Sequence, residues 1–403
     1  MKKVLIINTT LNKGGAARVA CGLFENLNSD FDVFFAYGRG VKSPIAKTFY
    51  FGNKLEMLIH IFLVRFFGLE GFGSYFSTKK LINFIRREKF DLINLHNIHG
   101  YYLNFFTLIK FIQKENIAVV WTFHDEWPIT WLPGHSLGCE HCKMGTGKCT
   151  NAYSYPKNYF PIFAKFMLKK KKETFLNNWN PSIVCPSNWL QENIRNSFMS
   201  KFNIKVINNG IDTELFKPAI NKNFLRIKHN LPLNKKIIVF SASNLNDKSK
   251  GIDCIISMAK KLSCKDYLFL GVGTGKIKGI NNILTTGYIY NRAEFAEIYS
   301  LADLFCFVSA VETFFLSAVE ALSCGIPVIG YDIPAVREII SKDVGVLVEA
   351  GNEKKLIQAI INLFENEQKI SDKENNRRKL VLDNYSQELF LKNYSNLFNE
   401  ILK

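Results

Sequence analysis

The sequence predicts an α/β protein built from two Rossmann-like domains. At 403 residues the chain is too long for one average domain, and it fits two units of roughly 180 to 200 residues. Each half opens with the same pattern of a short apolar strand, a glycine-containing turn and a helix. This pattern starts at Val4 in the first half and at Ile237 in the second. The duplication predicts one parallel sheet in each half.

The composition excludes a disordered chain and favours a protein of a reducing compartment. Hydrophobic residues make up 47% of the chain, enough for a sizeable core. The nine cysteines are an odd number and lie mostly in apolar runs, as reduced core residues of a cytosolic protein do. The N-terminus is typical of a strand rather than a signal peptide, and no apolar run approaches the ~18 residues of a membrane span. We therefore expect a cytoplasmic protein.

The net charge of +17 is unevenly distributed. Residues 1–212 hold 27 Lys and Arg against 14 Asp and Glu, whereas the remainder holds 25 against 21. A positive field of this kind attracts nucleic acid, anionic lipid or a phosphorylated substrate. Because the sequence contains no RNA- or DNA-binding module, we expect no nucleic-acid partner and favour lipid.

The first domain begins with a buried strand from Val4 to Asn8, followed by the turn TTLNKGG and a helix. Gly14 and Gly15 allow the backbone to approach a ligand without Cβ atoms in the way. Their spacing is not G-x-G-x-x-G, so the dinucleotide-binding fingerprint is absent. This pair indicates either a ligand-binding turn or an ordinary strand-to-helix connection.

Three apolar segments of the first domain have basic flanks. They cover Leu55–Leu69, Lys79–Lys89 and Phe160–Lys172, and the last ends in four consecutive lysines. Such segments can lie in a lipid headgroup layer, or the first two can form a helix pair that packs on the sheet. Together they favour peripheral contact with an anionic membrane, which would place the protein at the cytoplasmic face of the inner membrane.

Two predicted strands of the first domain end in histidines. The predicted strand from Leu92 to Asn97 ends at His96 and Asn97, with His99 shortly after it, and His124 falls at the carboxyl end of the strand VVWTFHD. The carboxyl ends of parallel strands face the ligand crevice of such a domain. We therefore interpret His124 as a functional residue, with Asp125 holding its tautomer.

A glycine-rich insertion, WLPGHSLGCEHCKMGTGKC, follows this strand. Its C-x2-C pair, third cysteine and nearby histidine have the composition of a structural zinc site, which would order an otherwise irregular loop. A redox pair and free thiols are the alternatives. The expected zinc ligands are Cys139, Cys142, Cys149 and His135.

The centre of the second domain is a helix between two apolar strands, at residues 304–308 and 327–330. Glu320 lies in the middle of this apolar helix, and Glu312 lies in the loop before it. The helix N-terminus offers free N–H groups and a positive dipole end, which suit a phosphate. One anion site and two hydroxyl-binding acids within two turns predict a receptor for a phosphorylated sugar.

The frame S-x2-E-x7-E-A-x2-C-G-x-P of this region resembles the nucleotide-sugar site of the retaining glycosyltransferases of family 4, which have the two-domain GT-B fold. It is filled by Ser309, Glu312, Glu320, Ala321, Cys324, Gly325 and Pro327. Further motifs resemble the family in the same order along nearly the whole chain: the HD motif at His124, NGID before Phe216 and Pro218, and Lys250-Gly251.

The resemblance implies two Rossmann-like domains with parallel sheets that face each other across a cleft. It also implies a C-terminal helix that crosses back to the first domain. The expected bounds are 1–212 for the N-terminal, acceptor-side domain, 213–236 for a linker, 237–384 for the nucleotide-sugar-binding domain and 385–403 for the returning helix.

The resemblance further implies a role for each site residue. Glu320 would bind ribose hydroxyls, Glu312 would bind sugar hydroxyls, and Lys248 and Lys250 would bind the phosphates. His124 would lie beside the transferred sugar. The implied donor-binding set is Gly14, Gly15, Lys248, Lys250, Gly273, Glu312, Phe314, Leu316 and Glu320, and the implied catalytic set is His124, Glu312 and Lys250.

The chain departs from the family pattern at two positions. An arginine usually stands near Leu245, before the lysine of the phosphate loop, and its absence requires Lys248 to substitute for it. Lysine is a point charge without the planar fork of arginine. Phe315 stands where many members have glycine, and we expect its bulky side chain to reshape the sugar pocket.

These features predict a retaining glycosyltransferase that requires no cofactor for catalysis, because fixed cations would neutralise the phosphates in place of a metal. The donor would be a nucleoside-diphosphate sugar and the acceptor a glycan or lipid-linked glycan of cell-surface polysaccharide biosynthesis. A sugar-nucleotide epimerase of the same fold is one alternative, and it would need acid/base carboxylates around the sugar. A non-catalytic sugar-nucleotide or lipid-binding module is the other.

Overall fold

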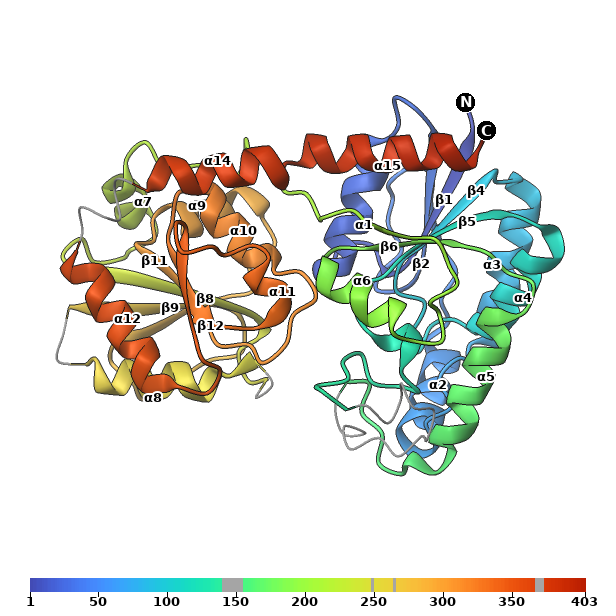
Figure 1. Cartoon of the computed structure of the whole chain (residues 1–403), viewed down its shortest axis with the longest axis horizontal. Coiled ribbons are helices and arrows are strands. Elements are labelled where there is room, and N and C mark those ends of the chain that lie inside the picture. The colour runs from blue at the N-terminus through green and yellow to red at the C-terminus, as the bar shows by residue number, and fades with distance from the viewer. Residues whose placement is uncertain (140–154, 248–249, 264–265, 367–372) are drawn as a thin grey trace. The chain divides into compact units, whose positions relative to one another are not determined.

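The computed structural model describes residues 1–139, 155–247, 250–263, 266–366 and 373–403. These residues form two compact units, which are described separately (Figure 1). Unit 1 comprises residues 1–208 and 391–403, and unit 2 comprises residues 209–390. Each unit contains a parallel sheet covered by helices.

The sheet of unit 1 has the strand order β3-β2-β1-β4-β5-β6-β7. The apolar run Val4–Ile7 of β1 is completely buried, as is typical of a central parallel strand. The chain extends from β1 to β3 on one side and then returns to place β4 beside β1, so the order reverses between β1 and β4. The strands are β1 (Lys3–Thr10), β2 (Asp32–Arg39), β3 (Thr48–Tyr50), β4 (Leu92–Leu95), β5 (Ala118–Thr122), β6 (Ser182–Cys185) and β7 (Ile204–Val206).

Helix α2 of unit 1 begins and ends at recognisable caps. Asn53 accepts hydrogen bonds from two backbone amides at the start of α2, and Gly68 ends that helix in the left-handed conformation. Residues 79–88 of the predicted helix at 79–89 lie in α3, where Leu81, Ile82, Phe84 and Ile85 are buried in the unit. The helices are α1 (Gly15–Asn26), α2 (Lys54–Phe67), α3 (Tyr75–Glu88), α4 (Phe105–Glu115), the 3-10 turns η1 (Trp127–Ile129) and η2 (Pro161–Phe163), α5 (Ala164–Leu176) and α6 (Asn188–Arg195).

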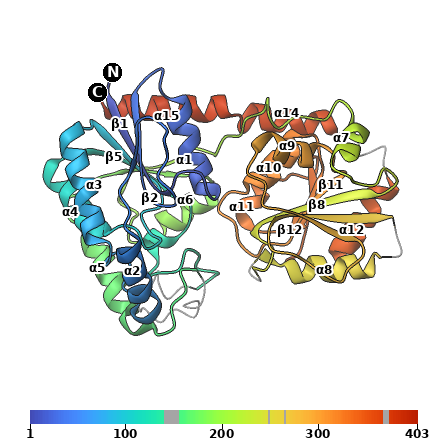
Figure 2. The same ribbon diagram turned by 180° about the vertical axis from the view of Figure 1, so that it is seen from behind.

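The last helix, α15 (Gln387–Ile401), belongs to unit 1 from Leu391 onward (Figure 2). The hydroxyl of Tyr394 lies 2.9 Å from Thr122 Oγ1 at the end of β5. Phe398 packs edge-on against Phe31, with ring centroids 5.6 Å apart. These buried contacts join the C-terminal segment to the sheet formed by the first 208 residues.

The sheet of unit 2 has the strand order β10-β9-β8-β11-β12-β13 and is also parallel. Its central strand, β8, is buried over Ile237–Phe240. The order reverses between β8 and β11, which pair directly. The strands are β8 (Lys236–Asn244), β9 (Tyr267–Thr274), β10 (Ile283–Gly287), β11 (Leu304–Phe307), β12 (Val328–Tyr331) and β13 (Gly345–Val348).

The helix predicted at the centre of unit 2 is α10, which is buried over its last six residues. It is apolar on nearly every side because it packs against α9 and α14 as well as against β12. The helices are α7 (Lys222–Lys228), α8 (Ile252–Lys261), α9 (Arg292–Ser300), α10 (Leu316–Ser323), α11 (Pro334–Arg337), α12 (Glu353–Glu365) and α14 (Glu374–Asn384).

The stretch 213–236, expected to be an irregular linker, contains helix α7 and packs within unit 2. The guanidinium of Arg226 is 6% exposed, and its Nη2 lies 2.7 Å from Asp303 Oδ2. It also donates to the carbonyl oxygen of Leu301. A helix of seven residues is too short for its periodicity to be read from sequence, and its stability depends on this buried ion pair.

Candidate functional site

Several predicted site residues of each unit lie where its strand order reverses. In open α/β sheets, ligands bind outside the carboxyl ends of the strands at this point. In unit 2, the loops after β8 and β11 carry Lys250 and Glu312. In unit 1, Gly14 follows β1 and His96 follows β4. The topology thus places Lys250, Glu312 and Gly14 at these points, whereas His124, the histidine of the HD motif, follows β5.

Lys250 and Glu312 form an ion pair in unit 2, with Nζ 2.9 Å from Oε1. The loop after β8 is held close to β11 through Gly251, which begins α8. A Cβ atom on Gly251 would lie 2.5 Å from the carbonyl oxygen of Val308, and its φ is +69°. Both the close approach and the left-handed conformation require glycine. The Lys-Gly pair therefore positions the amine beside the loop that carries Glu312.

The environment of Lys250 keeps its amine charged. Burial would lower its pKa, but the adjacent carboxylate of Glu312 outweighs this effect and raises the pKa above the ordinary value. The Lys250 side chain is still 32% exposed, so an incoming anion can reach it. This arrangement supplies a fixed cation next to a carboxylate. Lys248, the other predicted phosphate ligand, lies outside the described residues.

Glu320 lies in the middle of α10 and is only 2% exposed. Leu316 is the first residue of this helix and is partly exposed, whereas Phe314 is buried edge-on against Tyr385. The helix N-terminus therefore follows directly on the loop of Glu312. This places the predicted anion-binding amides and one of the two predicted acids in consecutive segments of unit 2.

Phe315 fills the core of unit 2 rather than a pocket. It is 7% exposed, and its ring centroid lies 4.7 Å from that of Phe307 on β11. The ring of Phe315 thus has a packing role, and the expectation that it reshapes the sugar pocket stays a prediction. The direction in which a loop side chain points depends on tertiary packing, which the motif spacing does not reveal.

The glycines predicted to bind the donor occupy structurally different positions. A Cβ atom on Gly273 would overlap the carbonyl oxygen of Ala242 at 1.8 Å, so the packing of β9 on β8 explains this glycine. Gly14 has a φ of +94°, and no described atom lies within 4 Å of the position of its Cβ. Gly14 and Gly15 are exposed at the start of α1. Their backbone is accessible to a ligand.

Asn94, His96 and His124 form a chain of hydrogen bonds across β4 and the end of β5. Asn94 Oδ1 lies 2.9 Å from His96 Nε2, and His96 Nδ1 lies 2.8 Å from His124 Nε2. The amide nitrogen of Asn94 donates to the carbonyl oxygen of Val120, so its Oδ1 must accept from His96. A neutral His96 then accepts through Nδ1, and His124 donates from its Nε2–H.

Burial keeps both rings neutral. It lowers the pKa of His96 well below the ordinary value, and the neighbouring His124 lowers it further. Burial lowers the pKa of His124 to about 4, because the opposing effect of Asp125 is smaller. At neutral pH, His124 is therefore a hydrogen-bonding group without a charge.

Asp125 binds a different histidine from the one expected. Its Oδ2 lies 2.9 Å from His99 Nε2, and its Oδ1 accepts from the amide of Trp127. The ring of His99 stacks on Trp127. Burial would raise the pKa of Asp125, but His99 and the amide of Trp127 contribute to holding it below the ordinary value. The role of fixing the His124 tautomer, expected for Asp125, belongs to His96.

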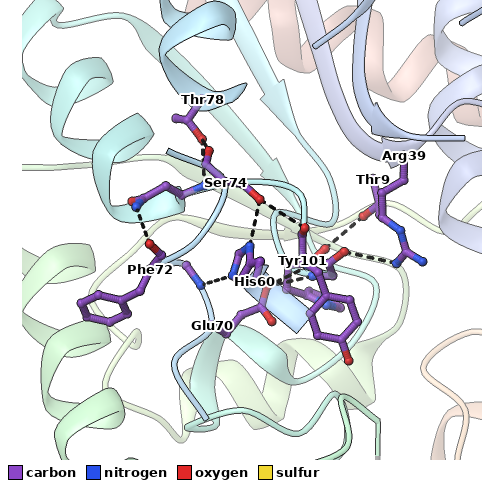
Figure 3. A network of polar contacts seen from close by, with 12 residues as sticks. Thr9, Arg39, His60, Glu70, Phe72, Ser74, Thr78 and Tyr101 are labelled. Carbon is purple, nitrogen blue, oxygen red and sulfur yellow. Dashed lines mark hydrogen bonds and ion pairs between the residues drawn. The ribbon is translucent and has the colours of Figure 1, made fainter. Parts of the chain in front are cut away.

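The turn after His99 is held by Glu70, which is fully buried (Figure 3). Glu70 Oε1 accepts hydrogen bonds from the amides of Gly100 at 3.0 Å and Tyr101 at 3.2 Å. Arg39 donates to the carbonyl oxygen of Gly100. Sequence reasoning missed Glu70, although the one acid inside the apolar stretch LVRFFGLEGFG was a detectable signal.

The zinc prediction falls largely outside the described part of the chain. Cys142 and Cys149 lie in residues 140–154, which are not described. Cys139 is a buried free thiol, and His135 lies four residues before it. Among the described residues, no group of three or more His, Cys, Asp or Glu side chains could hold a metal ion. The structural zinc site stays a prediction.

Two Rossmann-like units, each with a parallel sheet, make up the GT-B fold. Residues 13–215 match the family model described as Glycosyltransferase Family 4, and residues 221–380 match the model Glycosyl transferases group 1. The chain belongs to glycosyltransferase family 4.

Known proteins similar to this chain include two from Escherichia coli. One, WcaC, is named as a glycosyl transferase of colanic acid biosynthesis and is 26% identical, covering 88% of this chain and 89% of its own length. The other is named UDP-Gal:alpha-D-GlcNAc-diphosphoundecaprenol alpha-1,3-galactosyltransferase and is 24% identical, covering 68% and 73%. The structure of Anabaena HepE in complex with UDP-glucose matches the fold with a TM-score of 0.70 at 16% identity, covering 99% of this chain and 100% of that one.

Proposed function

We propose that this protein is a retaining glycosyltransferase that moves a sugar from a nucleoside-diphosphate sugar to a hydroxyl of a lipid-linked glycan. Family membership supports the transferase class. The names of the relatives support cell-surface polysaccharide biosynthesis and a lipid-diphosphate acceptor. The observation that carries the proposal is the Lys250–Glu312 ion pair at the strand-order reversal of unit 2.

The donor is proposed to bind mainly to unit 2. The amine of Lys250 binds the diphosphate and stabilises the charge that develops on the leaving group, together with Lys248. The amides at the start of α10 bind a phosphate oxygen. Glu312 accepts hydrogen bonds from sugar hydroxyls, and Glu320 accepts them from the ribose. In this proposal the fixed cations take the place that a metal ion has in other glycosyltransferases.

The reaction exchanges one bond at the anomeric carbon for another. The acceptor hydroxyl oxygen bonds to that carbon while the bond to the diphosphate oxygen breaks. The proton of the hydroxyl passes to the departing phosphate on the same face of the sugar. The configuration is retained without a side-chain nucleophile, so none is assigned. Lys250 contributes by stabilising negative charge rather than by transferring a proton.

In unit 1, His124 is proposed to bind a hydroxyl of the transferred sugar. His96 holds the proton of His124 on Nε2, which leaves Nδ1 unprotonated and suited to a hydroxyl donor. The exposed turn at Gly14 and Gly15 is proposed to let a ligand approach the backbone closely. The protein would act at the cytoplasmic face of the membrane that contains the lipid carrier.

The test begins with thermal-shift measurements against UDP-, GDP-, ADP- and dTDP-sugars, with UDP-galactose and UDP-glucose first. A cognate donor is expected to raise the melting temperature, because it binds the folded state alone. The stabilising donor is then incubated with a polyprenyl-diphosphate glycan, and the linkage is determined by NMR. An α-donor is expected to give an α-linked product. An inverted linkage would refute retention, and an epimerised sugar nucleotide without any glycan product would favour the epimerase.

A further inference from the structure

Helix α2 exposes most of its large apolar side chains to solvent, whereas an ordinary surface helix turns such side chains toward the core. Its buried residues are His60 and Val64, whereas a stripe of large apolar side chains faces solvent. The spacing of three, four and seven residues places them on one side of the helix. They are Leu55, Leu58, Ile59, Phe62 and Phe66, which are between 38 and 67% exposed.

This exposed stripe continues onto the segment that precedes α5. The ring of Phe66 lies 6.4 Å from that of Phe160, and the ring of Phe67 lies 6.5 Å from that of Phe163. Ile162 is 72% exposed on the same segment. We call the exposed apolar side chains of residues 55–67 and 160–166 the docking surface. A monomer in water rarely leaves such a cluster uncovered.

Positive charge surrounds the docking surface. Residues 155–172 contain six lysines and no acidic residue, and Lys165 and Lys169 are exposed beside the apolar side chains. Lys54 and Arg65 are exposed on α2 itself. Two copies of this chain meeting through the docking surface would bring like charges together, which disfavours self-association. In the part of the chain that the structure describes, no helix has the length and apolarity to cross a bilayer.

We propose that the docking surface binds the surface of an anionic lipid bilayer. Helix α2 lies in the interface with its leucine and phenylalanine side chains among the upper acyl chains, and the lysines lie at the level of the lipid phosphates. This inference extends the proposed function by naming the surface that meets the membrane of the lipid-linked acceptor. It is independent of the donor chemistry.

Helix α2 is also tied to the turn that carries His99 (Figure 3). His60 Nε2 accepts from the amide of Gly71, so the ring proton is on Nδ1, which lies 3.0 Å from Ser74 Oγ. Ser74 in turn donates to the carbonyl oxygen of Tyr101. A bilayer bound at α2 would therefore lie at a fixed position relative to the histidines that follow β4 and β5 in unit 1.

The test is vesicle flotation of the full chain with phosphatidylcholine vesicles that contain either no or 30 mol% phosphatidylglycerol. Binding is expected only with the anionic vesicles and is expected to weaken with salt. The triple variant Leu58→Ser/Ile59→Ser/Phe62→Ser is expected to bind at least about tenfold more weakly, because it removes three inserted side chains. The variant Lys165→Gln/Lys169→Gln is expected to lose about fivefold for each lysine.

The matched control is Ile220→Ser/Phe224→Ser/Ile227→Ser, which removes three apolar side chains of unit 2 that are at least 63% exposed. It is expected to bind like the parent, and melting temperatures check that all variants fold. The proposal would be overturned if the first triple variant bound vesicles as the parent does. It would also be overturned if the parent bound no vesicles but formed a dimer that the triple substitution disrupts. Vesicle binding without a thermal shift by any sugar nucleotide would refute the proposed function alone.

Discussion

Units 1 and 2 share a parallel-sheet plan but build their sites from opposite kinds of chemistry. In unit 2, Lys250 and Glu312 are charged, partly exposed and joined by one ion pair between two loops. In unit 1, Asn94, His96 and His124 are neutral and joined by hydrogen bonds between neighbouring strands. The charged site suits a diphosphate, and the neutral site suits sugar hydroxyls. In the proposed function, the charged site therefore takes the leaving group and the neutral site takes the sugar.

The largest expected effect is that of Lys250→Ala on turnover. Removing the cation that is proposed to stabilise the leaving diphosphate is expected to lower kcat by about 10²- to 10³-fold. The measurement is kcat and KM for donor consumption, with the melting temperature as a check on folding. Lys354→Ala, which removes an exposed lysine of α12, is the control and is expected to leave kcat unchanged. A fall in kcat of less than tenfold for Lys250→Ala would contradict the assigned role.

A second test separates packing from ligand binding in the loop that precedes α10. Phe315→Ala leaves a cavity beside Phe307 and is expected to lower the free energy of unfolding by about 3–5 kcal/mol. The measurement is urea denaturation, followed by donor thermal shifts with Phe315→Leu, which keeps most of the volume. Phe315→Leu is expected to retain the donor preference of the parent. A changed preference at unchanged stability would show that Phe315 lines the sugar pocket after all.

The contributions of the two sites to the stability of the fold are expected to change at opposite ends of the pH scale. His96 and His124 have lowered pKa values in the folded state, so the unfolded chain binds more protons below the ordinary histidine pKa. Stability is therefore expected to fall from about pH 6.5 towards pH 4, with a slope of up to about 1.4 kcal/mol per pH unit for each histidine. Lys250 has a raised pKa, so its contribution is complete below the ordinary lysine pKa and is lost only at higher pH.

Melting temperatures between pH 4 and about pH 11 check this difference. His96→Gln removes one of the histidines whose pKa is lowered in the folded state, and it is expected to make the fall of stability at acid pH shallower while leaving the alkaline side as in the parent. If the stability of His96→Gln fell toward acid pH with the same slope as that of the parent, the protons would be taken up by groups other than His96.

The sequence was sufficient to find Lys250 and Glu312 as candidates because both lie in motifs of fixed spacing, and the structure joins them in one ion pair. It did not reveal the role of His96, because its partner His124 is 28 residues away and the contact depends on β4 lying beside β5. Strand order is a tertiary property. With that order in hand, two histidines just past the ends of neighbouring parallel strands would have been expected to meet.

The other features that the sequence did not reveal have similar causes. Phe315 lies in a recognisable motif, but whether its ring points to a pocket or to the core depends on the position of β11 behind it. Helix α7 was missed because its stability depends on the contact of Arg226 with Asp303, which is distant in sequence. Glu70 was missed because its partners are backbone amides, which no sequence motif identifies. Local pattern identified the sheets and the charged site, and long-range contacts determined the rest.

The Lys250–Glu312 ion pair has a consequence for the end of the catalytic cycle. In the proposed binding mode an intact donor offers a new partner to both groups, phosphate to the amine and sugar hydroxyls to the carboxylate. The nucleoside diphosphate that remains after transfer offers a partner only to the amine and leaves Glu312 without one. Re-formation of the ion pair would then compete with the spent nucleotide and favour its departure, so that the carboxylate that selects the donor also helps to expel the product.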